Sequence, residues 1–126
     1  MDPTLISPVI IGSKGLLDVI RRHFSRRNRR HDAALTAIYA AANETRMYIA
    51  DAKKEKRRNR LRERKLVQLW TRAAVPARHV DRKLADRCLL KADLWIDPSQ
   101  WSPAQIREFR IGIDEVYEYA RQLLQE

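Results

Sequence analysis

The segment from Lys53 to Lys65 is the part of the chain whose residue types most clearly predict chemistry with a ligand. Its thirteen residues include nine Lys and Arg and two Glu, with no glycine or proline. Lysine and arginine bind phosphate oxygens, and arginine can do so through two parallel hydrogen bonds. A second basic run, from Arg21 to His31, contains six arginines and two histidines. We predict a nucleic-acid-binding surface made of Arg26, Arg27, Arg29, Arg30, Lys53, Lys54, Lys56, Arg57, Arg58, Arg60, Arg62, Arg64 and Lys65.

The positive charge of the chain is confined to its first half. The net charge is +10; residues 1–65 hold 17 Lys and Arg against 7 Asp and Glu, whereas residues 66–126 hold nine of each kind. Such a field attracts any polyanion, so nucleic acid, an acidic protein and an anionic membrane all stay open. Phe24 is the only aromatic residue near either run. We therefore expect recognition of the backbone or shape of a duplex or structured RNA, without base stacking.

No residue pattern predicts a metal, a cofactor or a catalytic centre. The three histidines (His23, His31 and His79) do not have metal-ligand spacing, and Cys88 is the only cysteine. Asp114, Glu115 and Glu118 fall within one helical turn, which is typical of a solvated acidic face. No glycine cluster could cradle a phosphate. We therefore predict a binding protein and not an enzyme.

One spacing resembles an enzyme family. Six residues separate Arg72 from His79, and four separate Arg26 from His31. This is similar to the HEPN ribonucleases, small helical bundles in which an arginine precedes a histidine by four to six residues. The resemblance implies an arginine that holds the scissile phosphate and a histidine that assists proton transfer at the 2′-hydroxyl. The chain departs from the family at Ala73, where a polar residue is common, and at Pro76, so a ribonuclease is our third hypothesis.

The elements that must position these residues are helices. The chain is 44% apolar and 33% charged, and none of its three glycines and five prolines lies between Ser25 and Val75. We predict a single all-α domain, an up-and-down bundle of four or five helices. The predicted helices span residues 8–24, 33–56, 61–75, 82–96 and 103–124.

Capping residues define most of these boundaries. The expected N-caps are Ser7, Asp32, Asp81 and Ser102, and Gln105 completes a capping box with Ser102. Pro76 is expected to end or kink the third helix, and Asp97-Pro98 to end the fourth. These signals predict short connections between neighbouring helices.

Apolar residues repeat at 3-4 spacing along two long helices, which we expect to form the spine of the bundle. Their predicted core residues are Leu35, Ile38, Ala42, Thr45, Ile49 and Ala52, and Ile106, Phe109, Ile113, Val116, Ala120 and Leu123. The helix over 82–96 is expected to bury Leu84, Cys88, Leu89, Ala92, Trp95 and Ile96. Leu90 and Leu94 form a second stripe that could contact another subunit.

The basic segment allows two arrangements. The chain could turn near Asn59 to make a helical hairpin, or continue as one long helix. Lys56, Asn59 and Glu63 occupy core positions of a continuous helix. Since three successive polar core residues disfavour a packed helix, we predict the hairpin, with the cations outside the core.

The helix over 8–24 also has two interpretations. Leu16, Leu17, Ile20 and Phe24 fall on one face, which Val19 interrupts. A bundle helix is our prediction, and the alternative is an adaptor that contacts a membrane surface or a protein partner through this helix. A homo-oligomer or a partner protein is also possible. With no signal-peptide pattern, no spanning apolar stretch and one cysteine, we expect a cytoplasmic protein.

Overall fold

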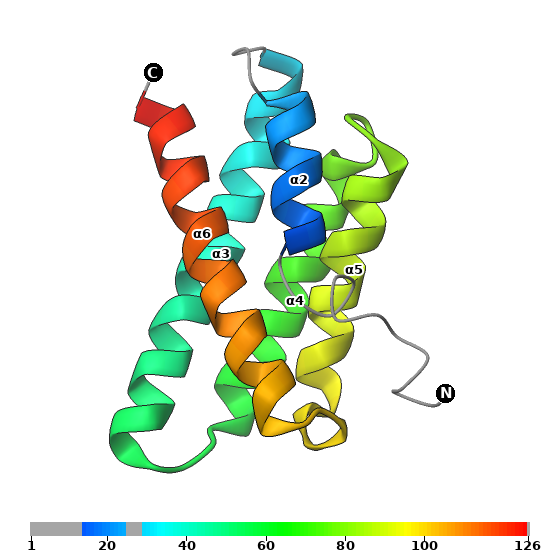
Figure 1. The fold of residues 1–126 in the computed structure, drawn as a ribbon. Coiled ribbons are helices and arrows are strands. Elements are labelled where there is room, and N and C mark those ends of the chain that lie inside the picture. Colours follow the sequence, from blue (N-terminus) through cyan, green and yellow to red (C-terminus); the bar gives the residue numbers. More distant parts are fainter. Residues whose placement is uncertain (1–13, 25–28, 126) are drawn as a thin grey trace.

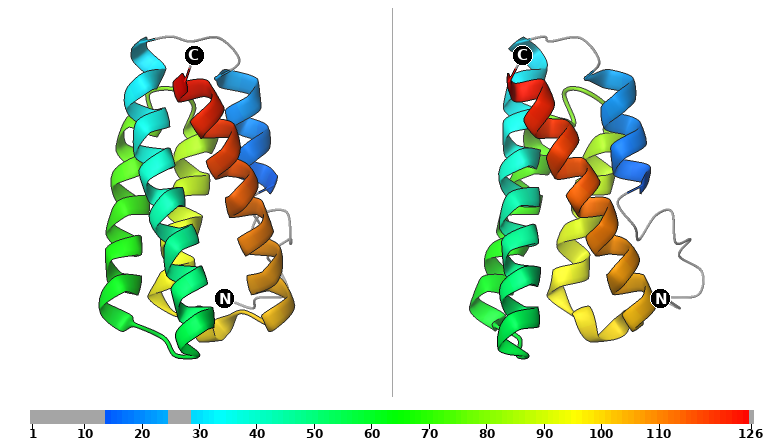
Figure 2. Two further views of the ribbon diagram at one scale, coloured as in Figure 1. Left: turned by 90° about the vertical axis from the view of Figure 1, so that its left-hand side faces the viewer. Right: turned by 60° about the vertical axis from the view of Figure 1, so that its left-hand side comes forward.

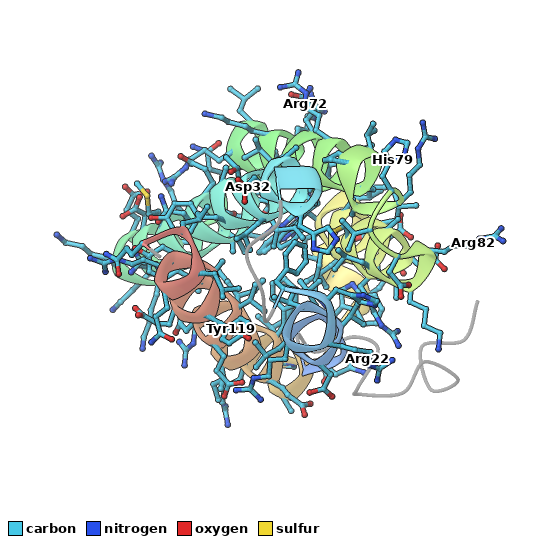
Figure 3. All side chains as sticks on the ribbon, turned by 90° about the horizontal axis from the view of Figure 1, so that it is seen from above. Arg22, Asp32, Arg72, His79, Arg82 and Tyr119 are labelled. Carbon is cyan, nitrogen blue, oxygen red and sulfur yellow. The ribbon has the colours of Figure 1, made fainter. Side chains whose placement is uncertain are left out.

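In the part of the chain that the structure describes, five α-helices form an up-and-down bundle, as the sequence predicts (Figure 1). The computed structural model describes residues 14–24 and 29–125, apart from the side chains of Lys14, Arg29 and Arg30. Successive helices run in opposite directions and surround one core when seen along the bundle (Figures 1 and 3). No strand occurs in the described part of the chain, and none of its helices is long and apolar enough to cross a bilayer. The helices are α2 (Lys14–His23), α3 (Arg29–Glu55), α4 (Arg60–Ala77), α5 (Arg82–Ile96) and α6 (Pro103–Gln125), with a 3₁₀ turn, η2 (Pro98–Gln100), between the last two.

The core is one cluster to which all five helices contribute. The two long helices α3 and α6 pack against each other, but α4 packs more extensively, against both α3 and α5. Trp70 of α4 is fully buried, and its Nε1 donates to Thr45 Oγ1 of α3 at 3.0 Å. The Thr45 hydroxyl in turn donates to the carbonyl of Ala41 at 2.7 Å. These two hydrogen bonds explain why a threonine is tolerated at a core position, because its hydroxyl both accepts and donates a hydrogen bond there.

The described part of the N-terminal helix is a member of the bundle. Leu16, Leu17, Ile20 and Phe24 are all buried, which confirms the predicted face. Val19 is buried as well, so its assignment as an interruption is wrong: α2 lies against both α5 and α6, and a helix between two neighbours buries a wider arc. The expected start at Ser7 lies outside the described residues.

The capping signals were mostly confirmed. The Gln105 N–H donates to Ser102 Oγ at 3.1 Å and the Ser102 N–H to Gln105 Oε1 at 2.8 Å, which is the predicted capping box. Asp81 accepts from the Lys83 N–H at 2.6 Å. Asp32 is not an N-cap, because α3 begins at Arg29; its carboxylate lies in the first turn, where the helix dipole favours it. Pro76 lies inside the last turn of α4, which ends one residue later.

The buried face of α5 differs from the predicted one. Leu89 and Ile96 are 43% and 56% exposed, and Leu94 is only 2% exposed. Lys91 is fully buried near the centre of the face. Leu84, Cys88, Ala92 and Trp95 are buried as predicted, and Lys91 and Leu94 complete the face in place of Leu89 and Ile96. Burial lowers the pKa of Lys91 to about 7, and its Nζ lies 5.4 Å from the ring centre of Phe109.

Cys88 behaves as a buried apolar residue, as expected from its place in a helical pattern. It is a free cysteine within the core. Burial raises the pKa of its thiol to about 12. The reactive thiolate is therefore absent at neutral pH.

Candidate nucleic-acid interface

The basic segment forms the tip of a helical hairpin. Helix α3 ends at Glu55 and α4 begins at Arg60, so the turn predicted near Asn59 is confirmed and the continuous helix is not formed. Lys56 leaves α3 with φ of 58°, the left-handed conformation that often ends a helix. Asn59 caps α4, because its side chain accepts the Arg62 N–H at 3.1 Å. The turn thus follows from the left-handed conformation of Lys56, which ends α3, and from the N-cap Asn59, which begins α4.

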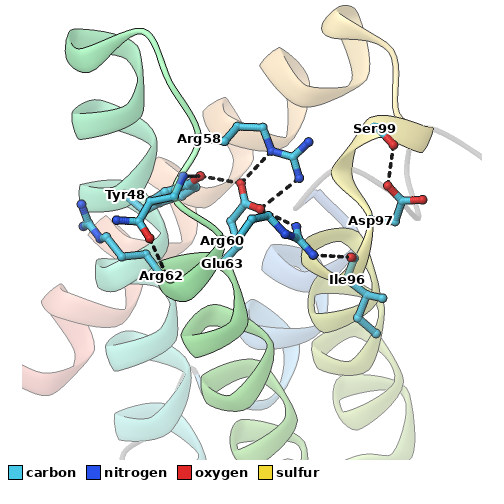
Figure 4. Close-up of polar contacts among 9 residues, drawn as sticks. Tyr48, Arg58, Arg60, Arg62, Glu63, Ile96, Asp97 and Ser99 are labelled. Carbon is cyan, nitrogen blue, oxygen red and sulfur yellow. Dashed lines mark hydrogen bonds and ion pairs between the residues drawn. The ribbon is translucent and has the colours of Figure 1, made fainter.

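A buried carboxylate lies at the centre of this tip. The Glu63 side chain is only 1% exposed. Arg58 donates to both of its oxygens, from Nε at 3.1 Å and from Nη2 at 3.0 Å, and Arg60 Nη1 donates at 2.5 Å. The Tyr48 hydroxyl of α3 donates to the same carboxylate at 2.5 Å (Figure 4). Two arginines of the basic segment therefore neutralise an internal charge.

Further contacts attach this cluster to its neighbours. The Tyr48 hydroxyl accepts the Asn59 N–H at 3.1 Å, and Arg60 Nη2 donates to the Ile96 carbonyl at the end of α5 at 3.1 Å. Arg62 pairs with Asp51 of α3 at 2.8 Å and lies 5.3 Å from the Tyr48 ring centre. The turn, both hairpin helices and the end of α5 are thereby joined by polar contacts (Figure 4).

The protonation states in the cluster follow from these contacts. Burial by itself would raise the pKa of Glu63, but the hydrogen bonds from Arg58, Tyr48 and Arg60 outweigh burial and lower it. Burial, together with the hydrogen bond to Glu63, raises the pKa of Tyr48. At neutral pH Glu63 is thus ionised and Tyr48 keeps the proton that it donates.

The cations of the segment lie outside the core, as predicted, whereas Glu63 lies inside it. Glu63 belongs to the buried face of α4, at 3-4-3-4 spacing with Leu66, Trp70, Ala73 and Ala77, and all five residues are buried. A lone acid in core register within an arginine-rich segment was the sequence signal for this cluster. Arg58 and Arg60 lie within five residues of Glu63, whereas its third partner, Tyr48, could not be inferred because it lies on another helix.

Six of the predicted binding residues remain as exposed cations, and none forms an ion pair with a described residue. Lys53, Lys54, Lys56 and Arg57 lie at the end of α3 and in the turn, and Arg64 and Lys65 lie on the first turns of α4. The structure therefore divides the nine predicted residues of the segment 53–65 into two sets. The set that makes internal contacts is Arg58, Arg60 and Arg62; the set without them, the free-cation set, is Lys53, Lys54, Lys56, Arg57, Arg64 and Lys65.

Two of the other predicted residues, Arg29 and Arg30, lie at the opposite end of α3. Arg29 and Arg30 begin this helix of 27 residues, which is about 40 Å long at 1.5 Å per residue. Their side chains, and Arg26 and Arg27, lie outside what the structure describes. The length of α3 therefore separates the backbone of Arg29 and Arg30 from the hairpin tip.

A pocket of about 520 Å³ adjoins the hairpin tip, and no sequence pattern indicated it. Its apolar wall includes Tyr48 of α3, Trp95 of α5 and Ile106 of α6. Lys53 and Arg57 of the free-cation set line it as well. The pocket was missed because these residues come together only when three helices and η2 pack.

Three residues of the ribonuclease resemblance, Arg72, His79 and His31, do not line this pocket; Arg26 lies outside the described residues. Arg72 is exposed on α4 and His79 is exposed in the turn before α5, and Figure 3 shows both on the outside of the bundle. His31 is half-buried, with its ring edge-on to Phe24 at 5.2 Å between centroids. Among the described residues no group of His, Cys, Asp and Glu could hold a metal ion.

Comparison with known proteins adds no relative. No protein-family model, curated protein or solved structure matches the chain. The class that the fold and tip define is a small basic helical bundle with a cationic hairpin tip.

Proposed function

We propose that the protein binds nucleic acid through the free-cation set at the hairpin tip. The observation that supports this most strongly is the division of charges there. Three arginines contact internal carboxylates, whereas six neighbouring cations contact no described acidic group. A solubilising surface would mix both signs of charge. The tip instead concentrates unneutralised cations around one turn, which suits a row of phosphates.

The expected mode is contact with the backbone or the shape of the nucleic acid. Phosphate contacts release bound counterions, so affinity should fall steeply with salt. Tyr48 is the aromatic residue nearest to the tip cations in the chain, and it is only 3% exposed. Without an exposed aromatic ring at the tip, base stacking cannot supply the affinity. The Glu63 cluster contributes indirectly, because it holds the turn in one conformation and reduces the entropy lost on binding.

The test uses three cations of the free-cation set that do not line the pocket, Lys54, Arg64 and Lys65. The triple variant to Gln should bind duplex DNA and structured RNA more weakly, by a similar factor for all sequences. If each residue contacts a phosphate, the slope of log affinity against log salt should fall by roughly 2 to 3. Fluorescence anisotropy at several salt concentrations measures both quantities.

The matched control removes three charges elsewhere. Arg72, Arg78 and Arg82 are exposed on α4, after it and at the start of α5 (Figure 3 labels two of them). Their triple Gln variant has the same net charge and should keep the wild-type slope. Equal weakening by both variants would refute a site at the tip, and absence of wild-type binding at about 50 mM salt would refute nucleic-acid binding altogether. The latter result would direct the search to an acidic protein or an anionic membrane.

A further inference from the structure

The pocket beside the hairpin tip has the size and composition of a ligand site. Its volume of about 520 Å³ lies in the range of roughly 300–1,000 Å³ that small organic ligands occupy. Five apolar side chains wall it, from α3, α5 and α6. They are Tyr48, Ile49, Ala52, Trp95 and Ile106. The apolar part of a ligand would therefore bind favourably in the pocket, because it removes this apolar surface from water.

The edge of the pocket is positively charged. Lys53, Lys56 and Arg57 line it, are exposed, and form no ion pair with a described residue. Glu63 is the one carboxylate among the lining residues, and its charge is already neutralised by Arg58 and Arg60. The lining therefore carries an excess of positive charge on the side of the hairpin turn. An acidic group at this edge would be attracted, whereas a cation would be repelled.

A second hollow extends the pocket along α6. It has a volume of about 360 Å³ and shares Ile49 and Ile106 with the first. Trp101 and Pro103 add apolar wall, and Arg107 and Arg110 add two more cations. The lower halves of α3 and α6 diverge on this side of the bundle (Figure 2). The second hollow therefore adds apolar surface and two cations beside the pocket.

We infer that this pocket binds a small amphipathic anion. The ligand has an aromatic or aliphatic body, which packs chiefly against the half-buried Ile49, Ala52 and Ile106. Its one acidic group contacts Lys53, Lys56 and Arg57. The cationic edge of the pocket favours an anion. The apolar wall favours a ligand with an apolar group, which neither free phosphate nor a sugar has. This site is distinct from phosphate contacts by Lys54, Arg64 and Lys65, which do not line the pocket.

The probe for the test is anilinonaphthalene sulfonate, an apolar aromatic anion whose fluorescence rises in apolar surroundings. Wild-type protein should bind it saturably. The neutral analogue N-phenylnaphthylamine should bind about tenfold more weakly or worse, because it lacks the charge-assisted hydrogen bonds. Dodecanoate should displace the probe, and dodecanol should displace it poorly. Equal binding of the charged and neutral probes would overturn the assignment of an anion site.

Two variants, each with a matched control, test whether the probe binds in this pocket. Ala52→Leu fills the pocket and should abolish probe binding, whereas Ala50→Leu, exposed on α3 and not among the lining residues, should leave it unchanged. Lys53→Gln with Arg57→Gln should weaken the sulfonate about tenfold and leave the neutral probe unaffected. Lys54→Gln with Lys65→Gln is the charge-matched control and should change neither. Retained binding in Ala52→Leu, or equal loss in the two charge variants, would overturn the proposal.

Folding and self-association are checked in the same samples. Each variant must keep the wild-type melting temperature, since a loosened core also binds this probe. If Ala52→Leu does not fold, the comparison of the two charge variants tests whether the pocket binds the anion. If a second copy occupied the pocket, probe affinity would fall as protein concentration rises and sedimentation would show a dimer, which overturns a small-ligand site. Nucleic-acid binding is scored separately with Lys54→Gln, Arg64→Gln and Lys65→Gln, so either proposal can fail without the other.

Discussion

The buried Glu63 carboxylate makes Arg58 and Arg60 structural residues, and this can be measured. Glu63 is 1% exposed, whereas the two arginines are 49% and 48% exposed. Water therefore screens each pair on its arginine side, which reduces the gain from either one. We expect Arg58→Gln to destabilise the protein by about 1–2 kcal/mol, because Arg60 and Tyr48 still contact the carboxylate. The double change Arg58→Gln and Arg60→Gln leaves a buried charge without a cation and should cost about 3–5 kcal/mol.

Urea unfolding at pH 7 gives these values from the midpoint and the slope of each transition. The matched control is Arg64→Gln with Lys65→Gln, which removes the same charge from exposed positions of α4 and should change stability by less than about 0.5 kcal/mol. Adding Glu63→Gln to the double variant should restore most of the lost stability, because no charge is then buried. A double variant as stable as the control would refute the reasoning.

The pH dependence of stability gives an independent check of the same cluster. The pKa of Glu63 in the folded protein lies below its ordinary value of 4.5. The ionised carboxylate therefore contributes stability that is complete above pH 4.5 and is lost as the pH falls through the lower, folded-state pKa. Glu63→Gln should lack this part of the acid-induced loss. If the two proteins lost stability in parallel below pH 4.5, Glu63 would not be ionised and paired as described.

Three other substitutions test local structure by thermal or urea unfolding. Lys56→Gly should stabilise the protein by about 0.5–1 kcal/mol, since glycine adopts the left-handed conformation without strain; Lys56→Ala should not. Ser102→Ala should cost about 1 kcal/mol through the lost cap of α6, and a change within error would contradict the capping box. Thr45→Val should cost about 1–3 kcal/mol, because it leaves the buried Trp70 indole N–H without an acceptor; Thr45→Ser keeps the hydroxyl and should cost less.

Local signals in the sequence were sufficient for the helices. The capping box at Ser102 predicted the start of α6 correctly, and Asp81 predicted the start of α5, because both depend on contacts within four residues of the chain. Two of the errors involve charged residues inside apolar faces. Lys91 was not predicted in the buried face of α5, and Glu63 was interpreted only as evidence for a turn. A single sequence did not show that Glu63 is buried, although its cation partners Arg58 and Arg60 are close in sequence, because its burial depends on packing against other helices.

The same limit applies to the candidate sites. The composition predicts a basic hairpin tip, but it does not distinguish cations that pair with carboxylates of the protein from cations that remain unpaired. In the folded chain Arg58 and Arg60 neutralise Glu63, and Arg62 pairs with Asp51. The pocket beside the tip depends on contacts between α3, α5 and α6, which no local pattern encodes.

This division of the cations changes how the function must be tested. A substitution that combines Arg57 with Arg58, Arg60 and Arg62 would weaken binding of a polyanion and also remove the partners of a buried carboxylate. Lost affinity in that variant could then result from lost folding. Substitutions confined to Lys54, Arg64 and Lys65 change the field at the tip and leave the Glu63 contacts intact. A loss of affinity in this variant at unchanged melting temperature would therefore assign binding to the exposed cations, because no internal contact has been removed with them.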